Sequence, residues 1–110
     1  MSLPRADTLA ESLVGRTVRT FLGRDPRIVG VEDGVVVVAD DRSDERVQVP
    51  LADVQAGLDQ LHAEGEVSVT ITALGPGATY VAAMLVEVEG AAYGEFAARV
   101  ERSGRRRAAP

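Results

Sequence analysis

The fold of this chain depends on residues 65–90, which read GEVSVTITALGPGATYVAAMLVEVEG. Apolar and polar side chains alternate over residues 67–72, as they do in a strand that buries one face. The Gly75-Pro76-Gly77 sequence can then turn the chain into a second strand that ends at Val88. On this interpretation, residues 66–88 form a β-hairpin.

The same residues also suit two helices. Ser68 can cap a short helix that bears Ile71 and Leu74, and Gly75 can turn the chain after it. A second helix over residues 78–86 then places apolar side chains at spacings of three and four. Strand propensity is stronger in the first half of the stretch, and helix propensity is stronger in the Ala-rich second half. We expect the helices and keep the hairpin as the alternative.

Four short segments upstream, rich in Val, Thr, Ile and Phe, predict strands over residues 16–22, 27–32, 35–40 and 45–49. Turn formers separate them, and Asp33-Gly34 is typical of a tight hairpin turn. These segments therefore predict a four-stranded antiparallel meander. Residues 35–38 are all Val and so apolar on both faces, which places them at the centre of the sheet or against a partner chain.

Two further helices are predicted outside the deciding stretch. Thr8 stands three residues before Glu11, the spacing of a capping box, which predicts a short helix over residues 9–14 that ends at Gly15. A longer helix is predicted over residues 51–64, where four apolar residues share one helical stripe: Leu51, Val54, Leu58 and Leu61. The predicted fold class is therefore α+β, a four-stranded antiparallel meander followed by a helical, helix-turn-helix-like unit.

Length and charge predict one domain with a tail. The chain has 110 residues and is 45% apolar, which fits a single globular core. Residues 99–107 hold five Arg and one acidic residue, whereas residues 1–98 hold seven Arg and sixteen acidic residues. We therefore predict a single α+β domain over residues 1–98 and a basic, disordered tail over residues 99–110.

Several chemistries lack the residues that they need. The chain has no Cys, which excludes disulfides, thiolate catalysis and Cys-based zinc sites. His62 is the only histidine, so the common two-His metal patterns cannot form. The acidic loop over residues 40–45 lacks the glycine of a common calcium loop, and no phosphate-loop motif is present. We expect no catalytic residue, no cofactor and no metal, and we predict that the protein is not an enzyme.

The sequence also bears on location. The longest apolar run covers residues 81–86, far below the roughly 20 residues that a membrane-spanning helix needs. The first thirteen residues contain acidic residues where a secretion signal has an apolar stretch. We expect a cytoplasmic protein that does not act at a membrane.

Read as helices, residues 51–88 resemble the three-helix core of a helix-turn-helix domain. The phrase Leu-x-x-x-Gly-Glu-Val-Ser precedes the turn, and Gly75 at the turn position places Leu74, Val81 and Met84 at apolar core positions. The order of elements over residues 9–92 also resembles small bacterial domains in which a β-meander precedes a helix-turn-helix-like unit. That resemblance implies a fold but no settled activity.

Two classes of function fit this resemblance. A helix that reads DNA needs Arg, Lys, Asn or Gln side chains, and residues 77–88 offer only Thr79 and Tyr80 before Glu87. We therefore predict a non-enzymatic interaction or regulatory module that acts through protein–protein contacts. The alternative is a DNA-binding accessory or regulatory protein that uses the helix-turn-helix-like unit and the Arg-rich tail.

Candidate residues follow for each class. The helix over residues 78–86 is apolar around nearly its whole circumference, which one packing layer cannot bury, so we predict a homodimer or a protein partner on that helix. The predicted partner interface consists of Val81, Met84 and Leu85. The candidate nucleic-acid contacts are Arg16, Arg19, Arg24, Arg27, Arg105, Arg106 and Arg107.

Overall fold

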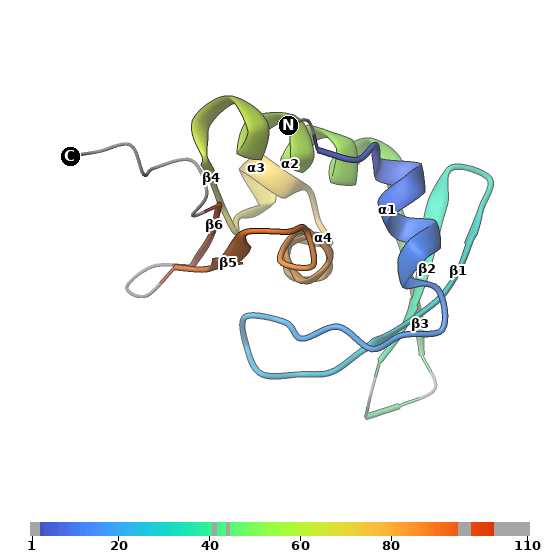
Figure 1. The fold of residues 1–110 in the computed structure, drawn as a ribbon. Coiled ribbons are helices and arrows are strands. Elements are labelled where there is room, and N and C mark those ends of the chain that lie inside the picture. The colour runs from blue at the N-terminus through green and yellow to red at the C-terminus, as the bar shows by residue number, and fades with distance from the viewer. Residues whose placement is uncertain (1–2, 41, 44, 95–97, 103–110) are drawn as a thin grey trace.

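The computed structural model describes residues 3–40, 42–43, 45–94 and 98–102. These residues form four helices and two three-stranded antiparallel sheets (Figure 1), which confirms the α+β class. In chain order the elements are α1 (Ala6–Leu13), β1 (Arg27–Glu32), β2 (Val35–Ala39), β3 (Arg46–Pro50), α2 (Leu51–Glu64), β4 (Glu66–Ser68), α3 (Ile71–Leu74), α4 (Ala78–Leu85), β5 (Ala91–Tyr93) and β6 (Arg99–Arg102).

The first sheet, sheet A, has the order β1-β2-β3. Its central strand is β2, as the run of Val residues predicts, and Val38 pairs with Ile28 on one side and Val47 on the other. On the inner face Val36, Val38 and Val49 are fully buried. Helix α1 packs against β1 and helix α2 packs against β3, so the helices cover that face.

The predicted four-stranded meander is wrong, because sheet A has three strands. Residues 16–20 do run antiparallel to residues 24–28, and the Val18 amide donates to the Pro26 carbonyl. Only the Thr17–Arg27 pair forms a β-bridge, however. Pro26 has no N–H to donate back to Val18, so this pair makes one backbone hydrogen bond where a regular antiparallel ladder makes two. The segment instead folds into a turn at Gly23, whose φ is +88°.

The second sheet, sheet B, has the order β4-β6-β5. Val67 in β4 lies opposite Val100 in β6, and both side chains are buried. The predicted tail is therefore wrong for residues 99–102, because Val100 enters the core and orders the strand around it. Residues 103–110, with the candidate contacts Arg105, Arg106 and Arg107, lie outside the described residues.

The structure decides between the two readings of residues 66–88. Residues 66–68 do form a strand, but it pairs with β6 and not with residues 79–88, so the hairpin alternative is wrong. Helix α4 ends one residue before the predicted boundary, and helix α2 has the predicted bounds. Thr70 caps α3 in place of the predicted Ser68, because its Oγ1 accepts a hydrogen bond from the Ala73 amide.

Helix α1 starts earlier than the capping box predicts. Its first residue is Ala6, and no side chain of the N-cap residue, Arg5, makes a capping hydrogen bond. The side-chain carbonyl of Gln55, on α2, accepts a hydrogen bond from the Ala6 amide at 2.9 Å. A side chain of the neighbouring helix α2 therefore accepts a hydrogen bond from a free N–H at the start of α1. A local sequence motif cannot reveal such a contact between distant residues.

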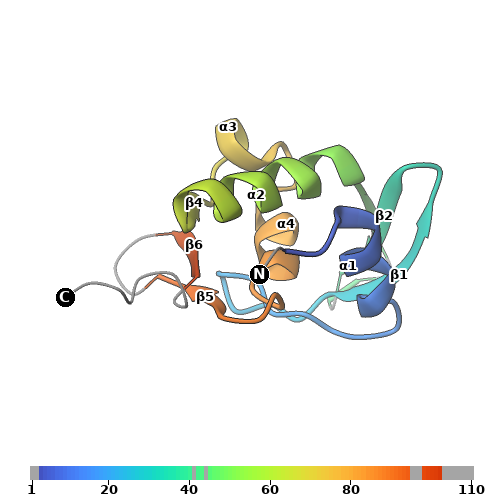
Figure 2. The ribbon, with the colours of Figure 1, turned by 45° about the horizontal axis from the view of Figure 1, so that its top comes forward.

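Helix α4 lies in the middle of the molecule, beneath α2 (Figure 2). Gly57 on α2 allows the close approach: a Cβ there would lie 2.9 Å from Leu74 Cδ2 and 2.9 Å from Leu85 Cδ1. A larger side chain at position 57 would therefore have to displace the Leu74 and Leu85 side chains.

Candidate functional site: an aromatic turn on the surface

The predicted partner interface lies in the core. Val81, Met84 and Leu85 are fully buried within the chain. Helix α4 contacts α1, α2, α3 and β6, so elements of the same chain cover most of its circumference, and Thr79 and Tyr80 are half-buried. The prediction that these three residues form a partner interface is therefore wrong, because α3 and β6, which the apolar pattern of the helix does not reveal, cover it together with α1 and α2.

The predicted nucleic-acid contacts on the domain are largely paired with acidic residues. Arg16 lies 3.7 Å from Glu87 and Arg19 lies 3.1 Å from Asp25, and Arg24 pairs with Asp40. Arg27 makes no ion pair among the described residues. A neighbouring carboxylate offsets the attraction of an arginine for phosphate. Helix α4 also presents no polar face that could enter a groove of DNA.

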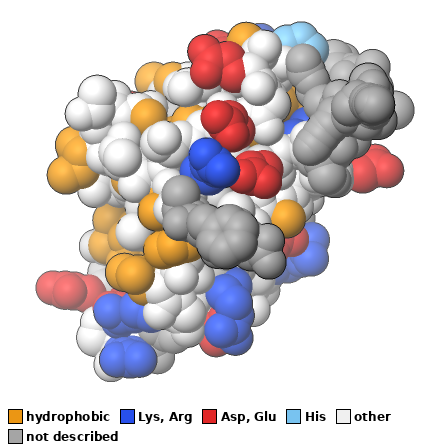
Figure 3. Space-filling model, turned by 90° about the vertical axis from the view of Figure 1, so that its left-hand side faces the viewer, with side chains coloured by type: hydrophobic (Ala, Val, Ile, Leu, Met, Phe, Trp, Pro, Cys, Tyr) orange, Lys and Arg blue, Asp and Glu red, His pale blue; other side chains and the backbone are white. Residues whose placement is uncertain are grey.

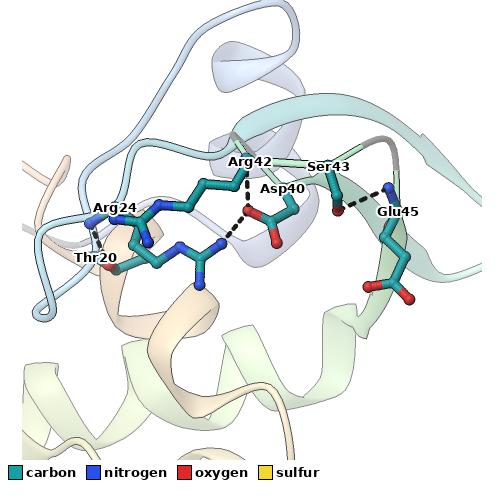
Figure 4. Close-up of polar contacts among 6 residues, drawn as sticks. All are labelled: Thr20, Arg24, Asp40, Arg42, Ser43 and Glu45. Atoms are coloured by element: carbon teal, nitrogen blue, oxygen red, sulfur yellow. Dashed lines mark hydrogen bonds and ion pairs between the residues drawn. The ribbon is translucent and has the colours of Figure 1, made fainter.

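Figure 4 shows how one surface turn, residues 20–24, is fixed in place. Thr20 is buried, and its Oγ1 accepts a hydrogen bond from the Arg24 amide at 3.0 Å. The Arg24 guanidinium reaches Asp40, whose carboxylate also accepts a hydrogen bond from the Arg42 amide at 3.0 Å. The turn is thus tied to the loop between β2 and β3.

The other side of the turn rests on β5. The Tyr93 hydroxyl donates a hydrogen bond to the Arg19 carbonyl at 2.7 Å, across 74 positions of sequence. The Tyr93 ring meets Phe21 edge to face, with centroids 5.7 Å apart. Burial, and then the negative charge of Glu87, raise the pKa of Tyr93 to about 12. The phenol therefore keeps its proton and its hydrogen bond well above neutral pH.

The turn carries apolar side chains into solvent. Leu22 is 71% exposed and Phe21 is 41% exposed. Tyr80 of α4 lines a cavity of about 80 Å³ beside Leu22 and Thr20. On the molecular face that Figure 3 views, apolar side chains lie beside arginines. We call residues 20–24, with Tyr80 and Tyr93, the aromatic turn.

This surface brings together three of the four aromatic residues of the chain. The sequence does not predict this surface, because residues 16–22 have the composition of a regular strand. One signal was present: Phe21-Leu22 stands directly before a glycine, where an apolar pair at a turn has no strand neighbour to cover it.

Two hollows lie elsewhere on the described surface. One, of about 290 Å³, opens at the end of sheet A and is lined by Thr17, Asp25, Arg27, Ala39, Asp40, Ser43 and Arg46. The other, of about 240 Å³, lies between the chain before α1 and helix α2, and His62 stands at its edge. The described residues contain no group of three His, Cys, Asp or Glu side chains that could hold a metal ion.

Comparisons with known proteins returned no relative: no protein-family model, curated protein or solved structure matches the chain. The resemblance to small bacterial domains with a helix-turn-helix-like unit therefore stays a prediction. No helix in the described part of the chain has the length and apolar character to cross a membrane. Function must be inferred from the chemistry of the surface.

Proposed function

We propose that the protein is a non-enzymatic interaction module that binds a protein partner through the aromatic turn. The observation that carries the proposal is the exposure of Phe21 and Leu22 on a turn held by contacts from other segments. Large apolar side chains exposed together on a small protein are typical of binding surfaces.

The composition of the surface fits this function. Aromatic and Arg side chains are enriched among the residues that contribute most to binding at protein interfaces. Arg19 and Arg24 flank the apolar pair, and each is held by a carboxylate. A suitable partner offers an apolar pocket for Leu22 and Phe21, with polar but uncharged acceptors such as carbonyl oxygens at its rim.

The rigidity of the turn favours binding. The Thr20–Arg24 hydrogen bonds, the Arg24–Asp40 ion pair and the Tyr93 hydroxyl fix the turn before any partner arrives. A surface that is already ordered loses less conformational entropy when it binds. Ile71 is also exposed, but it stands alone on α3, whereas Phe21 and Leu22 are exposed next to each other.

The DNA-binding alternative has no supporting observation in the described residues. Three of its four candidate contacts on the domain, Arg16, Arg19 and Arg24, already face carboxylates. It stays an untested hypothesis, and a salt titration addresses it, since phosphate binding weakens steeply as salt rises.

The proposed function can be tested by site-specific photocrosslinking in cells of the source. A photoreactive residue replaces Leu22 in one protein and Ile71 in the control, because these side chains are 71% and 70% exposed. We expect a defined crosslinked protein from position 22 only, and we expect F21S/L22D to lose that partner in a purified binding assay. Equal products from both positions, or no product from position 22, would contradict the proposal.

A further inference from the structure

The outer face of sheet A has no covering layer among the described residues. Helices α1 and α2 cover the inner face, where Val36 and Val38 are fully buried. Side chains alternate along a strand, so Val35, Val37 and Ala39 point to the other face, where they are half-buried. The solvent face of an antiparallel sheet is usually polar. All five residues of β2 are instead apolar.

The strand register gives this outer face two charged ends. At one end Ala39 stands between Arg27 and Arg46. At the other end Val35 stands between Glu32 and Pro50. Val37 occupies the middle row, between Gly30 and Gln48. The face is therefore basic at one end, apolar along its centre and acidic at the corner occupied by Glu32.

The charged groups at both ends are available. Within the part of the chain that the structure describes, Arg27, Arg46 and Glu32 make no ion pair, and all three are exposed. The basic row also borders the hollow of about 290 Å³, because Ala39 is too small to fill the space between the two arginines. The two acidic residues of that hollow, Asp25 and Asp40, are paired with Arg19 and Arg24.

We propose that a second copy of this chain covers the outer face of sheet A and makes the protein a homodimer. Each row consists of the outer-face residues that lie opposite one another on β1, β2 and β3. If a twofold axis lies between the two sheets and runs perpendicular to their strands, the first row of one copy faces the last row of the other. The basic row of each copy then faces the row of the other that holds Glu32, Val35 and Pro50, with Val37 near the axis. Arg27 of each copy meets Glu32 of the other, twice by symmetry.

The pattern favours a second copy over an unrelated partner. With the axis perpendicular to the strands, the basic end of one copy faces the end of the other copy that holds Glu32. With the axis parallel to the strands, Arg27 of one copy would face Arg46 of the other. Charge complementarity of this kind fixes the orientation of two partners. The proposal does not depend on the aromatic turn, since Phe21 and Leu22 lie outside these rows.

Sedimentation of the full chain tests the dimer and its location. At a concentration on the order of 100 μM we expect a species of twice the chain mass. V37D should sediment as a monomer, whereas the matched surface variant I71D and the turn variant F21S/L22D should remain dimeric. Far-ultraviolet dichroism checks that each variant is folded. A monomeric wild type, or a V37D dimer as stable as that of the wild type, would refute the proposal.

A charge exchange tests the orientation. R27E and E32R should each raise the dissociation constant at least about tenfold, because each opposes like charges across the interface. The double variant R27E/E32R restores opposite charges and should return to within about threefold of the wild type. If the double variant instead dimerises more weakly than either single variant, the proposed axis is wrong.

Discussion

Helix α4 and strand β2 carry the same sequence signature and have different surroundings. Both are apolar on every side, yet six of the eight residues of α4 are buried, whereas only two of the five residues of β2 are. Other elements of the chain surround α4, while helices cover one face of β2 alone. Apolar residues on every side therefore indicate a need for two packing layers, and the topology decides whether the same chain supplies both.

The largest effect that this comparison predicts comes from placing a charge in each element. L85D puts a carboxylate at a fully buried position and should lower the free energy of unfolding by more than about 4 kcal/mol, enough to unfold a small domain. V37D, on the outer face of β2, should leave the monomer folded. Urea unfolding of both variants measures the difference. A folded, cooperative L85D would mean that α4 is not a core helix.

The turn that positions α4 should be the next most sensitive point. Gly75 has φ +84° and ψ 179°, a conformation that is essentially restricted to glycine, and a Cβ there would collide with the carboxylate of Asp53. G75A should therefore lower the free energy of unfolding by about 2–3 kcal/mol.

Gly30 provides the control for G75A. A Cβ at Gly30 meets no atom within 4 Å, and its φ is not in the left-handed region. At a concentration too low for association, G30A should change the stability of the monomer by less than about 0.5 kcal/mol. Equal effects of the two substitutions in urea unfolding would show that the α3–α4 turn does not constrain the helix.

The two faces of β2 can be compared directly with a substitution that changes polarity but little volume. V38T buries a hydroxyl among apolar side chains and should cost about 1–3 kcal/mol of stability. V37T should change the stability of the monomer by less than about 0.5 kcal/mol. Thermal unfolding at a concentration too low for association distinguishes them. A loss in V37T as large as that in V38T would show that the same chain covers both faces.

The sequence predicts the parts of this fold that depend on local patterns. The apolar stripe of residues 51–64 defines helix α2, and the Asp33-Gly34 turn separates β1 from β2 as predicted. The central position of β2 follows from its apolar composition alone. In each case the determining residues are close together in the sequence.

The features of the fold and of the surface site that the sequence does not predict depend on contacts between distant segments. The sequence of strand β6 is typical of a basic tail, because two of its four residues are Arg. In the structure, however, Val100 lies opposite Val67 and completes sheet B. The aromatic turn exists because Tyr93 binds a carbonyl 74 positions away. Periodicity carries no information about such pairings, so neither the buried state of α4 nor the exposed site could be derived.

The smallest predicted effect concerns the aromatic turn, which packs against the start of α4 at Tyr80. Tyr93 has a pKa of about 12 in the folded protein, and an unfolded tyrosine titrates near 10. The folded state thus holds this proton more tightly, so its contribution to stability is complete below pH 10 and is lost as the pH rises from about 10 to about 12. Solvent near the half-buried ring reduces the size of this contribution to stability.

An ultraviolet titration should show a tyrosine ionising near pH 12 that is absent in Y93F, and stability should decline less between pH 10 and 12 in Y93F than in the wild type. If the wild type and Y93F show the same last tyrosine ionisation, the Tyr93 ring is not packed against Phe21, and the aromatic turn lacks the support that the proposed function requires.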